Sequence, residues 1–246
     1  MTAEIATWTP PWLDRPLQAG RYGHFGRPVV FFPTGGADWL DCERFGMVEA
    51  LAPLIEAGEI KLYSVDAVNR DAWTQPDLPP WRRAWLQARY DEWLVEQLVP
   101  AIRRDCGGYE GPLLAAGASL GAYQALNALC KHPQHFGAGV GMSGTYILDR
   151  RVGGWWGPDY YFNQPVQYLP NLGDSAQLRA LRQRRFLFGL GSGPHESPDY
   201  TWRAADVLGA KGVPNRVEVW GQGSDHDWPT WRAMLPAFLP QLMRSL

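Results

Sequence analysis

Short apolar or alternating runs and longer amphipathic stretches follow one another along most of the chain. The short runs predict six β-strands, at residues 28–33, 59–65, 111–118, 136–142, 185–190 and 216–220. Apolar residues at helical spacing between them predict helices over residues 38–57, 81–104, 120–130, 200–210 and 231–246, with Pro236 and Pro240 interrupting the last. Strands that alternate with helices predict an α/β protein whose mostly parallel sheet is covered on both faces.

One stretch departs from this alternation. Residues 145–181 are polar and aromatic, have little periodicity, and contain Trp155, Trp156, Tyr160, Tyr161, Phe162 and Tyr168. Loops of this length inside a compact domain are usually functional or locally structured. We therefore expect an insertion whose aromatic side chains, Trp155, Trp156 and Tyr160 among them, line a substrate pocket. No linker divides the chain, so we expect residues 1–246 to form a single domain.

Composition narrows the class of protein. Of 246 residues, 46% are hydrophobic and 20% charged, as in a folded globular chain. With 23 basic and 25 acidic residues there is no positive excess to neutralise a nucleic-acid backbone, so a dedicated nucleic-acid binder is not expected. No apolar stretch approaches the ~20 residues that cross a bilayer, and the first ten residues do not resemble a signal peptide. We expect a cytoplasmic protein without membrane association.

The residues Gly117-Ala118-Ser119-Leu120-Gly121 follow the pattern G-x-S-x-G. They stand where a predicted buried strand ends and a helix begins, the context in which this pattern exposes a nucleophilic serine on a strained turn. Small residues at 117 and 121 let the strand and the helix approach closely. A serine hydroxyl is a poor nucleophile without a base, so Ser119 as nucleophile requires a histidine.

Chain order selects the base and the acid. In proteins with this nucleophile turn, the acid and then the histidine follow the serine. His226 comes just after the last predicted strand and is the expected general base. Glu196 and Asp199, in the loop after strand 185–190, are the two candidate acids; Glu196 is preferred because Asp199 is well placed to cap the next helix. His132 and His135 flank Pro133 and are interpreted as surface residues, and no metal site is expected.

Backbone amides complete the predicted site. The N–H of Leu120, directly after the nucleophile, is one expected oxyanion donor. The second is expected from the loop after the first buried strand, with Gly35 favoured and Gly36 or Thr34 as alternatives. Asn69, Arg70 and Trp73 follow the next strand at the same sheet edge, where open α/β sheets bind ligands, and are candidate pocket residues.

The motifs PVVFFPTGG, SVDAVNRDAW, GASLGAY and GSDHDWPTW resemble the putative-esterase branch of the α/β-hydrolase fold. That branch includes esterase D (S-formylglutathione hydrolase), feruloyl esterases and mycolyltransferase-type acyltransferases, and the similarity spans roughly residues 22–242. It implies a serine–acid–histidine triad, here Ser119, Glu196 or Asp199, and His226. It also implies serine acyl chemistry that uses neither a metal nor an organic cofactor.

These observations predict a serine esterase that cleaves a small-molecule carboxylic ester through an acyl-enzyme. Two alternatives remain: an acyltransferase that uses the same triad, and a non-catalytic protein that keeps the fold for binding. The Trp-rich helix at 81–104 offers a face that a second copy of the chain could cover, so a homo-oligomer is possible.

Overall fold

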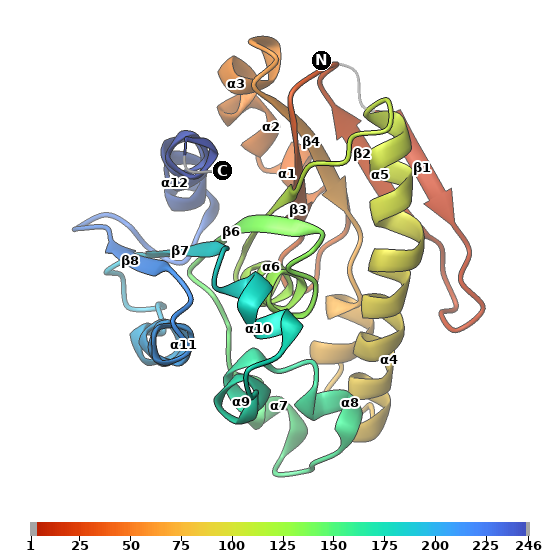
Figure 1. Ribbon diagram of the computed structural model, residues 1–246, viewed down its shortest axis with the longest axis vertical. Coiled ribbons are helices and arrows are strands. Elements are labelled where there is room, and N and C mark those ends of the chain that lie inside the picture. The colour runs from red at the N-terminus through yellow and green to blue at the C-terminus, as the bar shows by residue number, and fades with distance from the viewer. Residues whose placement is uncertain (1–3, 245–246) are drawn as a thin grey trace.

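A computed structural model describes residues 4–244. Eight strands form one sheet in the order β1-β2-β4-β3-β5-β6-β7-β8 (Figure 1). Strands β3 to β8 are parallel, whereas β2 runs antiparallel to both β1 and β4. The strands are β1 (Glu4–Trp8), β2 (Leu17–Tyr22), β3 (Arg27–Phe32), β4 (Ile60–Val65), β5 (Leu113–Ala118), β6 (Phe136–Met142), β7 (Arg185–Leu190) and β8 (Asn215–Val219).

The six predicted strands are confirmed as β3 to β8, with ends that differ by at most two residues. The hairpin of β1 and β2 was not predicted. Gly20, inside β2, lacks the side chain that a typical strand residue would pack, and the ring of Trp39 occupies the space beside it. The hairpin extends the sheet beyond β4 and carries the loop of residues 9–16 to the carboxyl edge of the parallel strands.

Helices cover both faces of the sheet. One face packs against α1 (Asp41–Arg44), α2 (Met47–Ala50), α3 (Ala52–Glu56) and α12 (Trp228–Met243). The other packs against α4 (Pro80–Trp93), η2 (Leu94–Leu98), α5 (Val99–Asp105), α6 (Leu120–Lys131) and α11 (Pro198–Ala210). In Figure 1, α12 and α11 lie on opposite sides of β7 and β8. Side chains alternate along β3, so that Val29 and Phe31 enter one core and Val30 and Phe32 the other.

The single helix predicted over residues 38–57 is instead three short helices. Gly46 has φ 73°, a left-handed conformation that ends α1, and Pro53 lacks the N–H that would continue α2 into α3. The helix predicted over 81–104 runs without a break from α4 through the wide turn η2 into α5. The last helix begins at Trp228 and contains both prolines; residues 245–246 of its predicted span lie outside the described residues.

The segment of residues 145–181 is locally structured. It forms α7 (Asp149–Val152), α8 (Pro158–Tyr161), α9 (Pro165–Tyr168), η3 (Leu169–Asn171) and α10 (Ala176–Leu181). Of these, α7 and α8 contact α4, whereas α9 and α10 contact α6 (Figure 1). A further short helical turn, η1 (Asn69–Trp73), follows β4. Between residues 4 and 244, none of these helices has the length and apolar character of a membrane span.

Candidate active site

Ser119 occupies a sharp turn between β5 and α6. Its φ of 55° and ψ of −120° are unfavourable for a residue with a side chain. Hydrogen bonds fix this backbone, from the Ser119 N–H to the Met142 carbonyl (2.9 Å) and from the Thr145 N–H to the Ser119 carbonyl (3.0 Å). The Ser119 side chain is half-buried rather than enclosed. The strand and helix thus hold a strained serine at the carboxyl edge of the sheet.

Two glycines make this turn possible. A Cβ on Gly117 would collide with the Gly121 carbonyl, and a Cβ on Gly121 would collide with the Phe32 carbonyl. The close approach of β5, α6 and β3 therefore requires glycine at both positions. The structure thus has the strained serine and the two closely packed glycines that the G-x-S-x-G motif predicts.

The oxyanion donors can be compared through their hydrogen bonds. Leu120 is the first residue of α6, where backbone N–H groups have no partner inside the helix. The Thr34 N–H and hydroxyl both donate to Asp41, so the Thr34 amide is occupied. A Cβ on Gly35 would lie 3.4 Å from both the Leu120 and the Thr74 side chains, whereas Gly36 is exposed with nothing within 4 Å. Among the three candidates from this loop, Gly35 is the one that lies beside Leu120 with an uncommitted amide.

Glu196 and His226 face each other in the neighbouring loops. Glu196 follows β7 and His226 follows β8, so both lie at the same sheet edge as Ser119. The His226 Nδ1 and Glu196 Oε2 atoms are 4.0 Å apart, and the Glu196 side chain is 1% exposed. Asp199 is exposed in the first turn of α11 and makes no ion pair with His226. Of the two candidate acids, Glu196 is therefore beside the histidine.

Burial sets the electrostatics of this pair. The His226 imidazole is about three-quarters buried and packs edge-on against the Trp231 ring, with centroids 5.2 Å apart. Burial lowers the pKa of His226, and the negative charge of Glu196 partly opposes that shift. Both the burial and the lowered pKa favour the neutral form of the imidazole.

Ser143 holds the carboxylate in place, a role that the sequence analysis missed. Its hydroxyl donates to Glu196 Oε1 (2.6 Å) and accepts from the Trp231 indole N–H (2.9 Å). The Gly191 N–H also donates to Glu196 Oε1 (3.1 Å), which leaves Oε2 turned to His226. Ser143 follows Met142 at the end of β6, the strand beside β5, and has φ 48°. Its position at the end of the strand next to the one that leads to Ser119 was the available signal.

The acidic neighbours of His226, Asp225 and Asp227, shape its loop. Asp225 accepts from the His226 N–H (2.8 Å) and pairs with the exposed His195 (3.1 Å). Hydrogen bonds from the His226 N–H and from the His195 ring hold the pKa of Asp225 below its usual value. Asp227 caps α12 by accepting from the Thr230 N–H (3.3 Å).

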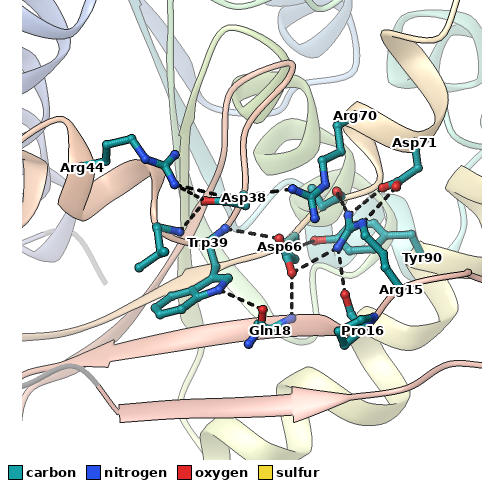
Figure 2. A network of polar contacts seen from close by, with 12 residues as sticks. Arg15, Pro16, Gln18, Asp38, Trp39, Arg44, Asp66, Arg70, Asp71 and Tyr90 are labelled. Carbon is teal, nitrogen blue, oxygen red and sulfur yellow. Dashed lines mark hydrogen bonds and ion pairs between the residues drawn. The ribbon is translucent and has the colours of Figure 1, made fainter.

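A polar network fixes the loop that carries Gly35. Figure 2 shows Asp66, at the end of β4, between Trp39 and Arg15. The Asp66 carboxylate is 1% exposed, accepts from the Trp39 N–H (3.3 Å), and pairs with Arg15 (3.2 Å). Arg15 also binds Asp71, and Arg70 reaches Asp38 at 3.8 Å. The loop of residues 9–16, the Gly35 loop and η1 are thereby tied together.

The predicted pocket residues Asn69 and Trp73 are buried and act as supports. The Asn69 amide donates to the Pro33 carbonyl (3.0 Å) and accepts from Gln124 (2.8 Å). The Trp73 indole donates to Gln87 (2.9 Å), which in turn bonds Gln124. These side chains link the Gly35 loop to α4 and α6. That Asn69 and Trp73 also line the substrate pocket stays a prediction.

The aromatic residues of the insertion differ in position. Tyr160 is 4% exposed, its hydroxyl donates to Asp149, and its ring belongs to the buried apolar cluster that contains Leu120. Trp155 packs against the same cluster, whereas Trp156 is 66% exposed. That these three residues line a substrate pocket stays a prediction. His132, predicted to be a surface residue, bonds the buried Asp91 (3.0 Å).

A large surface hollow lies away from the carboxyl edge of the sheet, where Ser119 and His226 stand. A surface cavity of about 820 Å³ opens near Arg27 and Lys61, at the amino ends of β3 and β4. Within residues 4–244, no three His, Cys, Asp or Glu side chains are grouped as a metal site.

The family follows from comparison with known proteins. The model of the family described as Putative esterase matches residues 65–242, which is most of the chain. The chain belongs to this esterase family. Membership supports hydrolase activity on an ester. No curated protein sequence matches closely enough to add to the assignment.

Solved structures agree on the fold. A ferulic acid esterase superposes with a TM-score of 0.72 at 17% identity, covering 100% of this chain and 98% of its own. An S-formylglutathione hydrolase from Agrobacterium tumefaciens also gives 0.72, at 13% identity with 98% and 94% covered. MPT51 (FbpC1) of Mycobacterium tuberculosis gives 0.72 at 16% identity, with 100% and 99% covered. At these identities the likeness establishes the α/β-hydrolase fold, which confirms the predicted fold class.

Proposed function

We propose that this protein is a serine esterase that hydrolyses a carboxylic ester through an acyl-enzyme, with Ser119 as nucleophile, His226 as base and Glu196 as acid. The observation that carries the proposal is the facing pair of His226 and Glu196, 4.0 Å apart, at the sheet edge where the strained Ser119 turn stands. Membership in the esterase family agrees with it. The fold alone would not support the proposal, because the same fold serves many functions.

In the first half of the reaction, the Ser119 oxygen attacks the ester carbonyl while His226 takes the hydroxyl proton. Negative charge develops on the carbonyl oxygen, and the N–H groups of Leu120 and Gly35 stabilise it. Glu196 stabilises the imidazolium and holds its tautomer. When the tetrahedral intermediate collapses, His226 gives its proton to the departing alcohol, and an ester joins the acyl group to Ser119.

In the second half, water attacks the acyl-enzyme and His226 takes a proton from it. Collapse of this second intermediate breaks the bond to the Ser119 oxygen, which regains its proton from His226. The acid is released and the enzyme is restored. The neutral state of His226, which burial favours, is the state that both halves require at their start.

The test is hydrolysis of 4-nitrophenyl esters of increasing acyl length. We expect Ser119→Ala and His226→Ala to lower kcat by at least about a thousandfold, and Glu196→Gln by about a hundredfold or more. Asp199→Ala is the matched control, with activity within about twofold of wild type, because Asp199 is exposed at the start of α11. Equal loss in Glu196→Gln and Asp199→Ala would contradict the choice of acid.

The same assay separates the alternatives. With glycerol or methanol present, an esterase releases mainly free acid, whereas an acyltransferase transfers most of the acyl group to the added alcohol. A protein that only binds its ligand would release no more 4-nitrophenol than Ser119→Ala does.

A further inference from the structure

Arg151 lies in α7, at the start of the insertion, and reaches toward the Gly35 loop. Its Nη1 donates to the carbonyl of Trp73 (2.6 Å). The next residue, Thr74, has its methyl group 3.4 Å from the position of a Cβ on Gly35. A single residue therefore separates the carbonyl that anchors Arg151 from the proposed oxyanion donor.

The apolar residues of α7 also pack close to the Ser119 turn. Val152 and Leu148 pack in one apolar cluster with Trp73 and Leu120, the residue that follows Ser119. The half-buried Arg151 thus belongs to a helix that packs beside Leu120, and its guanidinium is bound to the carbonyl next to the residue that lies against Gly35.

Arg151 carries a charge that the described protein does not neutralise. Within residues 4–244 no carboxylate lies within 4.0 Å of it, unlike Arg15, whose partners are Asp66 and Asp71. A second cation, Arg83, adds positive charge beside Arg151. Its side chain is 7% exposed and donates hydrogen bonds to the carbonyls of Leu78, Pro76 and Arg151. Burial and the positive charge of Arg83 lower the pKa of Arg151. A half-buried cation without a counter-charge is costly unless a ligand supplies one.

We propose that Arg151 binds a carboxylate carried by the ester substrate, so that the enzyme prefers anionic esters. This inference rests on the proposed function, because it places the carboxylate in the site served by Ser119. Among the described residues the guanidinium has one hydrogen-bond partner, the Trp73 carbonyl, and its other nitrogens can form charge-assisted hydrogen bonds with a carboxylate.

Two arms locate the carboxylate. On the acyl side, mono-4-nitrophenyl adipate is compared with 4-nitrophenyl hexanoate. On the alcohol side, 4-carboxyphenyl hexanoate is compared with its neutral carboxamide, 4-carbamoylphenyl hexanoate. In one arm, Arg151→Met should lower kcat/KM for the anionic ester by about tenfold to a hundredfold, as expected for hydrogen bonds to a charged group, and change the neutral ester by less than about threefold. The arm that responds tells which side carries the carboxylate.

Two control variants exclude a purely structural effect. Arg150→Met removes an exposed arginine from the same short helix. It should leave the ratio of kcat/KM for the anionic ester to kcat/KM for the neutral ester unchanged in both arms. Arg151→Lys keeps the charge and should recover part of the anionic preference. An anionic-to-neutral ratio that Arg151→Met leaves unaltered in both arms would overturn the proposal.

A binding measurement keeps the inference separate from catalysis. Calorimetry with the Ser119→Ala variant is run with both anionic esters, mono-4-nitrophenyl adipate and 4-carboxyphenyl hexanoate, and the Kd of one of them should be at least about tenfold weaker when Arg151→Met is added. If the wild type hydrolysed none of these esters, the proposed function would fail, and this comparison would still decide whether Arg151 binds the anion. Kd values that Arg151→Met leaves unchanged for both anionic esters would overturn the inference alone.

Discussion

The Nδ1 atom of His226 lies 4.0 Å from the Oε2 atom of Glu196. Both atoms are buried, and in the described part of the chain neither has a hydrogen-bond partner. The gap is about 1 Å longer than the ~2.9 Å of an N–H···O hydrogen bond, and catalytic hydrogen bonds are often longer in the absence of substrate. A small rotation of either side chain closes it, and each atom then satisfies the other.

Ser143 should act as a positioning residue for Glu196. Ser143→Ala removes the hydroxyl that donates to Glu196 and accepts from Trp231, so we expect kcat to fall about tenfold to a hundredfold while KM changes little. Trp231→Phe keeps a ring against His226 but loses the indole N–H, so we expect a smaller fall in kcat than in Ser143→Ala. Steady-state kinetics on a neutral ester measure both. A Ser143→Ala variant with wild-type kcat would remove Ser143 from the account.

The pH dependence of hydrolysis should report the buried imidazole. Because burial lowers the pKa of His226 below its ordinary 6.5, kcat/KM should fall only as the pH drops through a value below 6.5. Glu196→Gln removes the charge that favours the protonated ring, so the acid limb of its residual activity should move lower still. Initial rates between pH 4 and 9, corrected for recovery after return to pH 7, give the profile. An acid limb above 6.5 would contradict this environment for His226.

The glycine at the nucleophile turn should be sterically required. Gly121→Ala introduces a Cβ that collides with the Phe32 carbonyl, and we expect a loss of about 1–3 kcal/mol or more in the free energy of unfolding. Gly36→Ala is the matched control, because that Cβ meets nothing within 4 Å and should change stability by less than about 0.5 kcal/mol. Urea denaturation measures both variants, and similar midpoints would mean that β3 and α6 are not held as close as described.

The network of Figure 2 should stabilise the fold as well as the Gly35 loop. Arg15→Met leaves the buried Asp66 without its cation, and we expect a loss of about 2–4 kcal/mol and a lower kcat as the loop loosens. Arg44→Met breaks a more exposed pair with Asp38 and should cost less than about 1 kcal/mol. Chemical denaturation and ester hydrolysis test each variant. Equal losses in the two variants would argue against a special role for Asp66.

Much of the sheet could be predicted because β3 to β7 are almost entirely buried and have short, mostly apolar sequences. The last strand, β8, is more exposed and was predicted from the alternation of apolar and polar residues. The β1–β2 hairpin could not be predicted, since its short strands are not continuous apolar runs and depend on pairing with β4. The helix predicted over residues 38–57 divides because the left-handed turn at Gly46 outweighs the apolar periodicity.

Within the site, local motifs identified the Ser119 turn and chain order pointed to His226 and Glu196. The role of Ser143 could not be predicted because its contacts are distant in sequence: Glu196 is 53 positions away and Trp231 is 88 positions away. The hydrogen bonds of the Asn69 amide to Pro33 and Gln124 could not be predicted either, because they join residues 36 and 55 positions apart.

Labelling of the folded protein with a fluorophosphonate, followed by peptide mass mapping, tests the central claim most directly. The account predicts one adduct per chain on Ser119, none in Ser119→Ala, and labelling at least about a hundredfold slower in His226→Ala because the hydroxyl then lacks its base. No adduct, an adduct at another residue, or an unchanged rate in His226→Ala would contradict it.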